Sequence, residues 1–530
     1  MDLLALIFLS KTQQITLYMM NIKSINTIKA LSIHILAIVY ALLLDSSFGY
    51  ALRPGYALAT YLLLITVSPR KILFLILVTV LSIMSAIYAP ASFLFGSPNV
   101  NIVLSIMGSN IAESYEFLSF IPIKYYLFSM SILIIGTLLI INSNALITRH
   151  IKTALLIFLI IVFSRPIFSI ANSQDIEIGF TPVRFVNDFY KAVKIVREDN
   201  ARLKALINMK TTLAPTKASE DFDSYILVIG ESARRDFMGV YGFRINNTPF
   251  MNSSNGIIFN NYISAASSTQ TSISTSFIAN GVPQNNLLRL AHEQGLETWW
   301  ISNQGSYGDD DSQVSIIGKQ ADNIIFLKKG EYKTTNSDDT ELLPHIKEAL
   351  QSQSKHKLII VHLMGSHEDF CERTNNKYDV FYVNKSLSCY VQSIKNTDKL
   401  LSTIAQQATN DNKKWTMMYF SDHGLSFIKK NKKKYGEVVT LIHGDKTKEN
   451  FDIPLFITSY NAKDRTMKTF PYSAMNFLSL YLYWTGSIEK TISDKCNPLA
   501  KTDCKINNIS VIDYKHNLIN YSNLASEPAQ

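Results

Sequence analysis

The chain has 530 residues, of which 47% are hydrophobic, and its mean hydropathy is +0.10. That length allows two or three domains, and the averages combine an apolar part, up to about residue 170, with a later part that has the composition of a soluble protein. The formal net charge of +9 does not favour nucleic-acid binding, because the lysines are scattered, and we interpret the densest run, residues 429–434, as a solvated loop. Basic charge also suits a membrane surface rich in anionic lipid.

Five apolar stretches in the first part approach the roughly 20 residues that a helix needs to cross a bilayer. They cover residues 30–44, 51–68, 72–89, 125–141 and 153–170. Buried helices of a soluble core are a poor alternative for so many consecutive stretches. The sequence therefore predicts a transmembrane domain of five helices within residues 1–172.

Basic residues mark the loops on one side of these stretches. They are Lys23 and Lys29 before the first stretch, Arg70 and Lys71 after the second, and Arg149, His150 and Lys152 after the fourth. Because basic residues concentrate in cytoplasmic loops, the N-terminus is predicted to be cytoplasmic, and five crossings place the second half outside. The first twenty residues lack the pattern of a cleaved signal peptide, and Met19 or Met20 would be an equally sensible start.

Two further segments lie near the expected outer interface. Residues 105–120 contain Asn110 and Glu113 beside apolar residues, so they could contact a lipid headgroup or form a plain polar loop. Residues 181–210 repeat apolar side chains every three or four positions among charges, which is an amphipathic helical pattern. We expect residues 173–218 to form bridging helices and a linker.

The later part alternates buried strand patterns with helical segments. Short β-branched or apolar runs occur at residues 225–229, 358–361 and 417–420. This alternation predicts an α/β domain over residues 219–530, with a helix-flanked sheet whose functional groups gather where strands end.

Acids and histidines follow these runs. Glu231 follows the first, His367 lies after the second, and Asp422 and His423 follow the third, while His443 precedes another strand-like run at residues 453–458. One such residue is commonplace and a lone histidine is more often structural. The set, however, offers oxygen and nitrogen ligands of the kind that zinc accepts.

A hydroxyl-rich stretch at residues 264–277 contains Thr269 and Thr271 and then acquires helical apolar spacing. A hydroxyl in the first turn of a helix lies among free backbone N–H groups that favour a bound phosphate. An ordinary helix cap in a Ser/Thr-rich loop is the alternative.

Four cysteines are present, all in the later part. Their even number suits two disulfides, which would mean an oxidising compartment. Pairing each cysteine with its neighbour in the chain, Cys371 with Cys389 and Cys496 with Cys504, would close two short loops. Four separate buried thiols are the alternative.

Four motifs, taken in order, resemble those of the phosphoethanolamine transferases, membrane members of the alkaline phosphatase and sulfatase superfamily. They are the strand with Gly-Glu-Ser-Ala-Arg-Arg at 230–235, the T-x-T stretch at 269–271, Gly-Ser-His at 365–367 and Ser-Asp-His-Gly at 421–424. The resemblance covers nearly the whole chain. It implies a zinc ion (Zn²⁺) held by Glu231, Asp422 and His423, with Thr269 as fourth ligand and nucleophile.

The resemblance also implies substrate contacts. His367 and His443 would bind the phosphoryl group or a second metal, and Gln304 sits where the family often places an amide against phosphate. Asn110 and Glu113 match the polar groups of the family's lipid-facing segment. The implied donor is phosphatidylethanolamine, and the implied acceptor is lipid A, the lipopolysaccharide core or another envelope glycan.

Some residues depart from the lipid A-modifying members, which have Cys-Gly before the nucleophile and Ser-Val-Pro after it. Here Ser267 and Ser268 precede Thr269 and no such proline follows, so Thr271 stays the alternative nucleophile. A phosphoglycerol transferase, a sulfatase-like hydrolase and a non-catalytic membrane sensor are the rival functions. The expected location is a bacterial inner membrane, with the catalytic domain in the periplasm.

Overall fold

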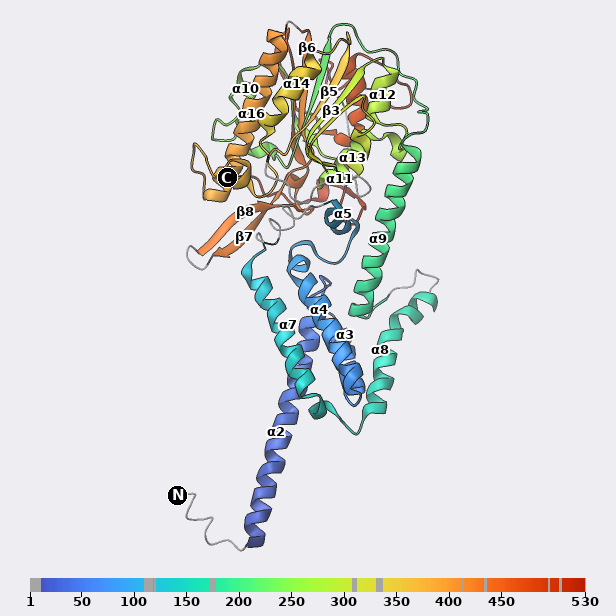
Figure 1. The fold of residues 1–530 in the computed structure, drawn as a ribbon, viewed down its shortest axis with the longest axis vertical. Coiled ribbons are helices and arrows are strands. Elements are labelled where there is room, and N and C mark those ends of the chain that lie inside the picture. The colour runs from blue at the N-terminus through green and yellow to red at the C-terminus, as the bar shows by residue number, and fades with distance from the viewer. Residues whose placement is uncertain are drawn as a thin grey trace. The chain divides into compact units, whose positions relative to one another are not determined.

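The computed structural model describes residues 11–108, 118, 121–171, 178–306, 312–329, 337–411, 413–432, 436–493, 496–504 and 508–529. The chain divides into two compact units, residues 1–98 with 121–192 and residues 99–120 with 193–530. The first unit is helical and the second is an α/β domain (Figure 1). The predicted fold class, a helical membrane domain followed by an α/β domain, is confirmed.

The first unit contains five apolar helices. They are α2 (Lys11–Ser46), α3 (Pro54–Val67), α4 (Lys71–Phe95), α7 (Ile123–Ile141) and α8 (Ile151–Ala171). Among the described residues, four stretches are long and apolar enough to cross a membrane: 27–46, 71–95, 123–141 and 151–169. The remaining predicted span is α3, which has 14 residues because it begins at Pro54 and ends before Pro69.

The surface of these helices matches a lipid environment. Ile72, Ile87 and Ile141 are each more than 70% exposed, which would be costly in water. Inside the unit, small and polar side chains let the helices approach: Tyr40 Oη and Ser82 Oγ lie 2.7 Å apart and are buried.

Among the described residues, the second unit contains the α-helices α5 (Val100–Gly108), α9 (Thr181–Leu206) from Val193 onward, α10 (Pro249–Ser253), α11 (Thr269–Phe277), α12 (Leu287–Glu293), α13 (Gln313–Gly318), α14 (Leu343–Leu350), α15 (Phe370–Arg373), α16 (Lys385–Asn410) and α17 (Phe477–Thr485). Its main sheet has the strand order β10-β2-β9-β6-β1-β5-β3-β4, with β11 beside β2. The strands are β1 (Ser224–Gly230), β2 (Gly256–Ile263), β3 (Glu297–Ser306), β4 (Asn323–Lys329), β5 (Lys357–His362), β6 (Trp415–Ser421), β9 (Asp452–Ser459), β10 (Arg465–Lys468) and β11 (Tyr472–Ser473).

The sheet is mixed. β6, β1, β5, β3 and β4 are parallel, whereas β9 runs antiparallel to both β6 and β2. Alternate residues of the central strand β1 face opposite layers: Tyr225 and Leu227 pack with α11, α12 and α17, and Ile226 and Val228 pack with α14 and α16. In Figure 1, α14 and α16 lie on one side of the strands β3 and β5, and α12 lies on the other. Burial on both faces explains why these strands are continuous apolar runs.

Among the described residues, the unit also contains two small hairpins, β7 (Ser426–Lys432) with β8 (Gly436–Ile442) and β12 (Ser510–Ile512) with β13 (Leu518–Asn520). The first corrects the interpretation of the lysine run as a loop. Lys429, Lys430 and Lys432 belong to β7, because their backbones pair with a β-branched strand that contains Val438 and Val439. Lys433 and Lys434 lie outside the described residues.

Both predicted disulfides are present. Cys371 is bonded to Cys389 and joins α15 to α16, and Cys496 is bonded to Cys504.

Candidate metal centre and active site

Two adjacent parallel strands bring the first acidic groups together. β1 pairs with β6 in a register that sets Gly230 opposite Ser421, so the next residue of each strand, Glu231 or Asp422, leaves the sheet at the same edge. Carboxyl ends of parallel strands form such sites in open α/β sheets. Ser232 turns the chain there with a φ of 56°, in the left-handed region, and its N–H donates to Asp422 Oδ1 at 3.0 Å.

The ligand atoms of Glu231, Asp422 and His423 all lie within 4.8 Å of one another. His423 Nε2 is 3.3 Å from Glu231 Oε1 and 3.4 Å from Asp422 Oδ2. All three side chains are at most 1% exposed. Two carboxylates and one imidazole form a compact donor set of a kind that zinc accepts.

Further hydrogen bonds orient the side chains of Asp422 and His423. Backbone N–H groups of Ser232 and His423 donate to Asp422 Oδ1, whereas the buried Oδ2 has no hydrogen-bond partner in the described part of the chain. His423 Nδ1 lies 2.8 Å from the Gly424 carbonyl, so Nδ1 carries the proton and Nε2 is left for a ligand. A buried carboxylate oxygen without a hydrogen bond, 3.4 Å from an imidazole nitrogen, fits a cation.

The electrostatics of the group show how strongly the three side chains interact. Burial opposes ionisation of Glu231, but the hydrogen bond and charge of His423 hold its pKa well below the usual value. Burial and the neighbouring Glu231 charge raise the pKa of Asp422 to about 7. Burial disfavours the charged form of His423, yet the two carboxylates prevail and raise its pKa to about 9. Without a cation, the group therefore retains protons at neutral pH.

Thr269 is the first residue of α11 and lies against this group. Its Oγ1 donates to Glu231 Oε2 at 3.1 Å and lies 3.3 Å from His423 Nε2. Thr271, the alternative, instead donates to Asn101 Oδ1 at 3.1 Å and lies 3.4 Å from His516 Nε2. The structure thus brings Thr269, and not Thr271, to the carboxylates.

Asn101 is a neighbour of the site that the sequence interpretation missed. It lies in α5, is 5% exposed, and accepts hydrogen bonds from both Thr271 and Ser268. The polar segment after the third apolar stretch was a usable signal, but it pointed to Asn110 and Glu113, which lie outside the described residues.

Three further predicted residues lie around the group. Gln304 Nε2 donates to Glu231 Oε2 at 2.9 Å, so this amide contacts a candidate metal ligand. The His443 ring is 4.7 Å from that of His423 and 6.3 Å from that of His367, between centroids. Burial and the two nearby histidines lower the pKa of His443 to about 3, which keeps its imidazole neutral.

The loop after β5 passes directly over Glu231. Gly365 adopts a φ of +49°, and a Cβ there would lie 2.9 Å from the Glu231 nitrogen. The partly buried Asp339 carboxylate holds the loop from the other side by accepting hydrogen bonds from the N–H groups of Met364 and Gly365, both at 2.8 Å. This position requires glycine because the two backbones are in close contact.

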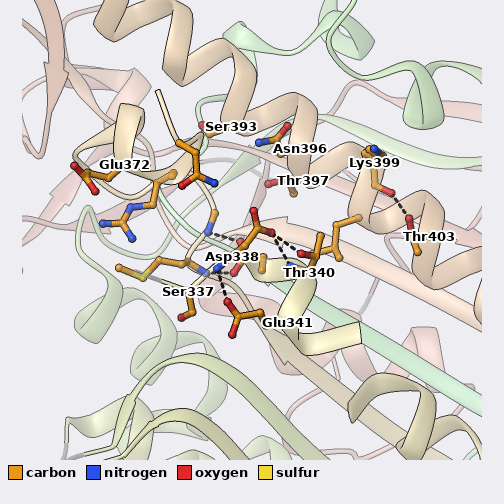
Figure 2. A pocket seen from close by; sticks show the side chains of 16 residues that line it. Ser337, Asp338, Thr340, Glu341, Glu372, Ser393, Asn396, Thr397, Lys399 and Thr403 are labelled. Carbon is orange, nitrogen blue, oxygen red and sulfur yellow. Dashed lines mark hydrogen bonds between the residues drawn. The ribbon is translucent and has the colours of Figure 1, made fainter. Parts of the chain in front are cut away.

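A polar cavity of about 380 Å³ lies behind this loop. Figure 2 shows its walls, which come from the segment before α14 and from α16: Ser337, Asp338, Thr340 and Glu341 on one side, and Ser393, Asn396, Thr397 and Lys399 on the other. Met364 and Gly365 also line it, so the loop separates the cavity from Glu231.

Comparisons with known proteins agree on one group of relatives. Residues 223–487 match the family model described as Sulfatase. The chain is 33% identical over 503 residues to phosphoethanolamine transferase OpgE of Escherichia coli K12, which covers 92% of this chain and 94% of that protein. It is 30% identical over 364 residues to a putative phosphoethanolamine transferase of Haemophilus influenzae, with coverage of 65% and 72%.

Solved structures show the same fold. The integral membrane protein lipooligosaccharide phosphoethanolamine transferase A (EptA) of Neisseria meningitidis aligns with a TM-score of 0.56 at 16% identity, over 87% of this chain and 96% of that one. The C-terminal periplasmic domain of EcEptC from Escherichia coli, in complex with Zn, aligns with a TM-score of 0.51 at 21% identity, over 60% and 98%.

Proposed function

Because this chain belongs to the phosphoethanolamine transferase family and carries a sulfatase-family domain, we propose that it transfers phosphoethanolamine from phosphatidylethanolamine to an envelope acceptor. Candidate acceptors are lipid A, the lipopolysaccharide core and another envelope glycan. The observation that carries the proposal is the meeting of a threonine hydroxyl with two carboxylates and an imidazole at one edge of the sheet.

Glu231, Asp422, His423 and Thr269 would hold zinc, since their donor atoms and burial fit that ion and a related domain was solved with it. Zinc, when bound, would supply Lewis acidity that acidifies a neighbouring hydroxyl and offsets negative charge.

The residues of the chain would then act in two steps. Thr269 Oγ1 attacks the phosphorus of the donor, a bond forms between them, and the bond from phosphorus to the diacylglycerol oxygen breaks. The threonine proton finally resides on diacylglycerol. In the second step, an acceptor hydroxyl oxygen attacks the phosphorus of the phosphoethanolamine-threonine intermediate, a bond forms between them, and the bond from phosphorus to Thr269 Oγ1 breaks. The proton of the acceptor hydroxyl finally resides on Thr269 and restores its hydroxyl.

Neighbouring groups would stabilise charge on the phosphoryl oxygens. Thr269 begins α11, so the free N–H groups of that helix end lie beside the reacting phosphorus. His367 and His443, whose rings lie near each other and near His423, would donate to the same oxygens, and Gln304 would orient Glu231 through its hydrogen bond.

The helices and the charge support the proposed location. Four apolar stretches of spanning length make this a multi-pass membrane protein, in line with its relatives. We propose that it lies in a bacterial inner membrane with a cytoplasmic N-terminus and a periplasmic α/β unit. The basic loops and the two disulfides support that orientation.

The test uses labelled phosphatidylethanolamine with the full chain in membranes. Transfer of label to an envelope lipid or glycan is expected for the wild type and for Thr271→Ala, whereas Thr269→Ala should lose at least about a thousandfold in rate. Mass spectrometry of the envelope then identifies the acceptor. Release of the label as a water-soluble product would instead reveal a hydrolase, and equal loss in both variants would refute the assignment of the nucleophile.

A further inference from the structure

Residues 525–529, which we call the strap, contact the short helix η7 (Lys448–Asn450). Through Arg234 they are also connected to residues 422–425, which we call the ligand loop because it contains Asp422 and His423. Ser526 Oγ donates to Glu449 Oε1 at 2.6 Å, and the Glu527 N–H donates to Glu449 Oε2 at 2.8 Å. Glu449 is 3% exposed, so the strap satisfies both oxygens of a buried carboxylate.

Arg234 forms hydrogen bonds with both the strap and the ligand loop. Its side chain is fully buried and its Nη2 donates to the Glu527 carbonyl at 2.8 Å. Its Nε and Nη2 donate to the Asp236 carboxylate at 2.9 and 2.6 Å, and its Nη1 donates to the Leu425 carbonyl at 3.0 Å. The Ala529 N–H donates to the same Asp236 carboxylate at 2.6 Å. One guanidinium thus links three separate segments.

The Leu425 carbonyl is two residues from His423. The Gly424 carbonyl, which accepts a hydrogen bond from His423 Nδ1 at 2.8 Å, belongs to the peptide group between Gly424 and Leu425. The Gly424 N–H is itself held by the Asn450 carbonyl of η7 at 2.8 Å. Both ends of this short loop are therefore fixed by groups that the strap supports, and the loop fixes the direction of the His423 ring.

We propose that Arg234 and the strap position His423 and Asp422 for the metal. Arg234 acts as a positioning residue. It donates a hydrogen bond to the Leu425 carbonyl, which follows Asp422 and His423 in the chain, and it is not itself a metal ligand. Groups that orient the ligands of a metal commonly contribute 10–100-fold to its affinity. The inference rests on the metal site under the proposed function and adds a role for residues that the reaction itself does not use.

The experiment measures the zinc dissociation constant of the full chain in detergent, by competition with a chromophoric chelator and without substrate. Arg234→Lys keeps the charge but cannot reach Asp236, Leu425 and Glu527 together, so we expect zinc to bind about 10–100-fold more weakly. A chain that ends at Leu524 should show a loss of the same order.

The matched control is the next residue. Arg235 also forms an ion pair, with Asp452 at 3.2 Å. Its other side-chain hydrogen bond goes to Asn261, which belongs neither to the strap nor to the ligand loop. Arg235→Lys should bind zinc within about twofold of the wild type. Thermal unfolding of each variant in a zinc chelator shows which proteins are folded at the assay temperature, and Glu449→Gln is the milder variant if the shortened chain does not fold.

Combining Arg234→Lys with the shortened chain decides whether the two act as one unit. If they do, the double variant binds zinc no more weakly than the weaker single variant. Folded Arg234→Lys protein with unchanged zinc affinity, or losses that multiply in the double variant, would overturn the proposal. The zinc titration contains no substrate, so its result does not depend on the transfer reaction. A protein that binds zinc as expected but transfers no phosphoethanolamine would refute the proposed function and leave the role of Arg234 and the strap standing.

Discussion

The raised pKa values in the ligand group predict how many protons leave when zinc binds. With pKa values of about 7 for Asp422 and about 9 for His423, the metal-free group carries about 1.2 protons at pH 7.5 and about 1.9 at pH 6. Zinc needs the imidazole nitrogen and both carboxylates unprotonated, so these protons are released on binding. With ordinary pKa values the release at pH 7.5 would be about 0.1.

The assay is titration calorimetry with zinc in pairs of buffers of different ionisation enthalpy, which gives the proton count directly. Thr269→Ala isolates the contribution of the three ligands. The wild type should release up to one proton more if Thr269 binds as an alkoxide. Zinc affinity should also fall as the pH falls, because protons compete for the same atoms. A release of about 0.1 proton by Thr269→Ala at pH 7.5 would refute the electrostatic description of the site.

Three other changes test the fold around the site. Burial lowers the pKa of His362 to about 4. As the pH falls from 6.5 to 4 the unfolded chain therefore takes up the proton first, and the wild type should lose about 3 kcal/mol relative to His362→Asn. Unfolding curves of both proteins in chelator measure this, and parallel pH profiles would contradict it. Replacing Cys371 and Cys389 by serine opens a loop with a sequence separation of 18, which should cost about 3 kcal/mol in denaturant titrations; an unchanged midpoint would count against that bond. Gly424→Ala would place a Cβ 2.0 Å from a backbone carbonyl of η7, so zinc affinity and thermal stability should both drop, whereas Gly55→Ala, which meets nothing within 4 Å, should change neither.

Much of the α/β unit follows from local patterns. The apolar runs at residues 225–229, 358–361 and 417–420 are the central strands β1, β5 and β6, because strands buried on both faces leave an unbroken apolar signature. The family was also recognisable from short motifs in order, and the similarity to OpgE confirms it.

Other features needed the folded chain. His443 precedes the predicted strand at residues 453–458, which is β9, but it also directly follows β8, which pairs with the lysine-rich β7 in a hairpin that the sequence interpretation missed. Asn101 contacts Thr271 although 170 positions separate them. No local pattern encodes such a contact, since it depends on which segments the tertiary fold packs together.

The sequence by itself determined the apolar helices, the strands and the kinds of chemical group at the strand ends, because periodicity and residue type are local properties. The tertiary structure decided which groups meet. Thr269 lies 38 positions from Glu231 and 154 from His423, and the register between β1 and β6, with the start of α11, brings the three within hydrogen-bonding distance. Thr271 has the same hydroxyl and nearly the same place in the chain, but two positions along a helix turn it to another side.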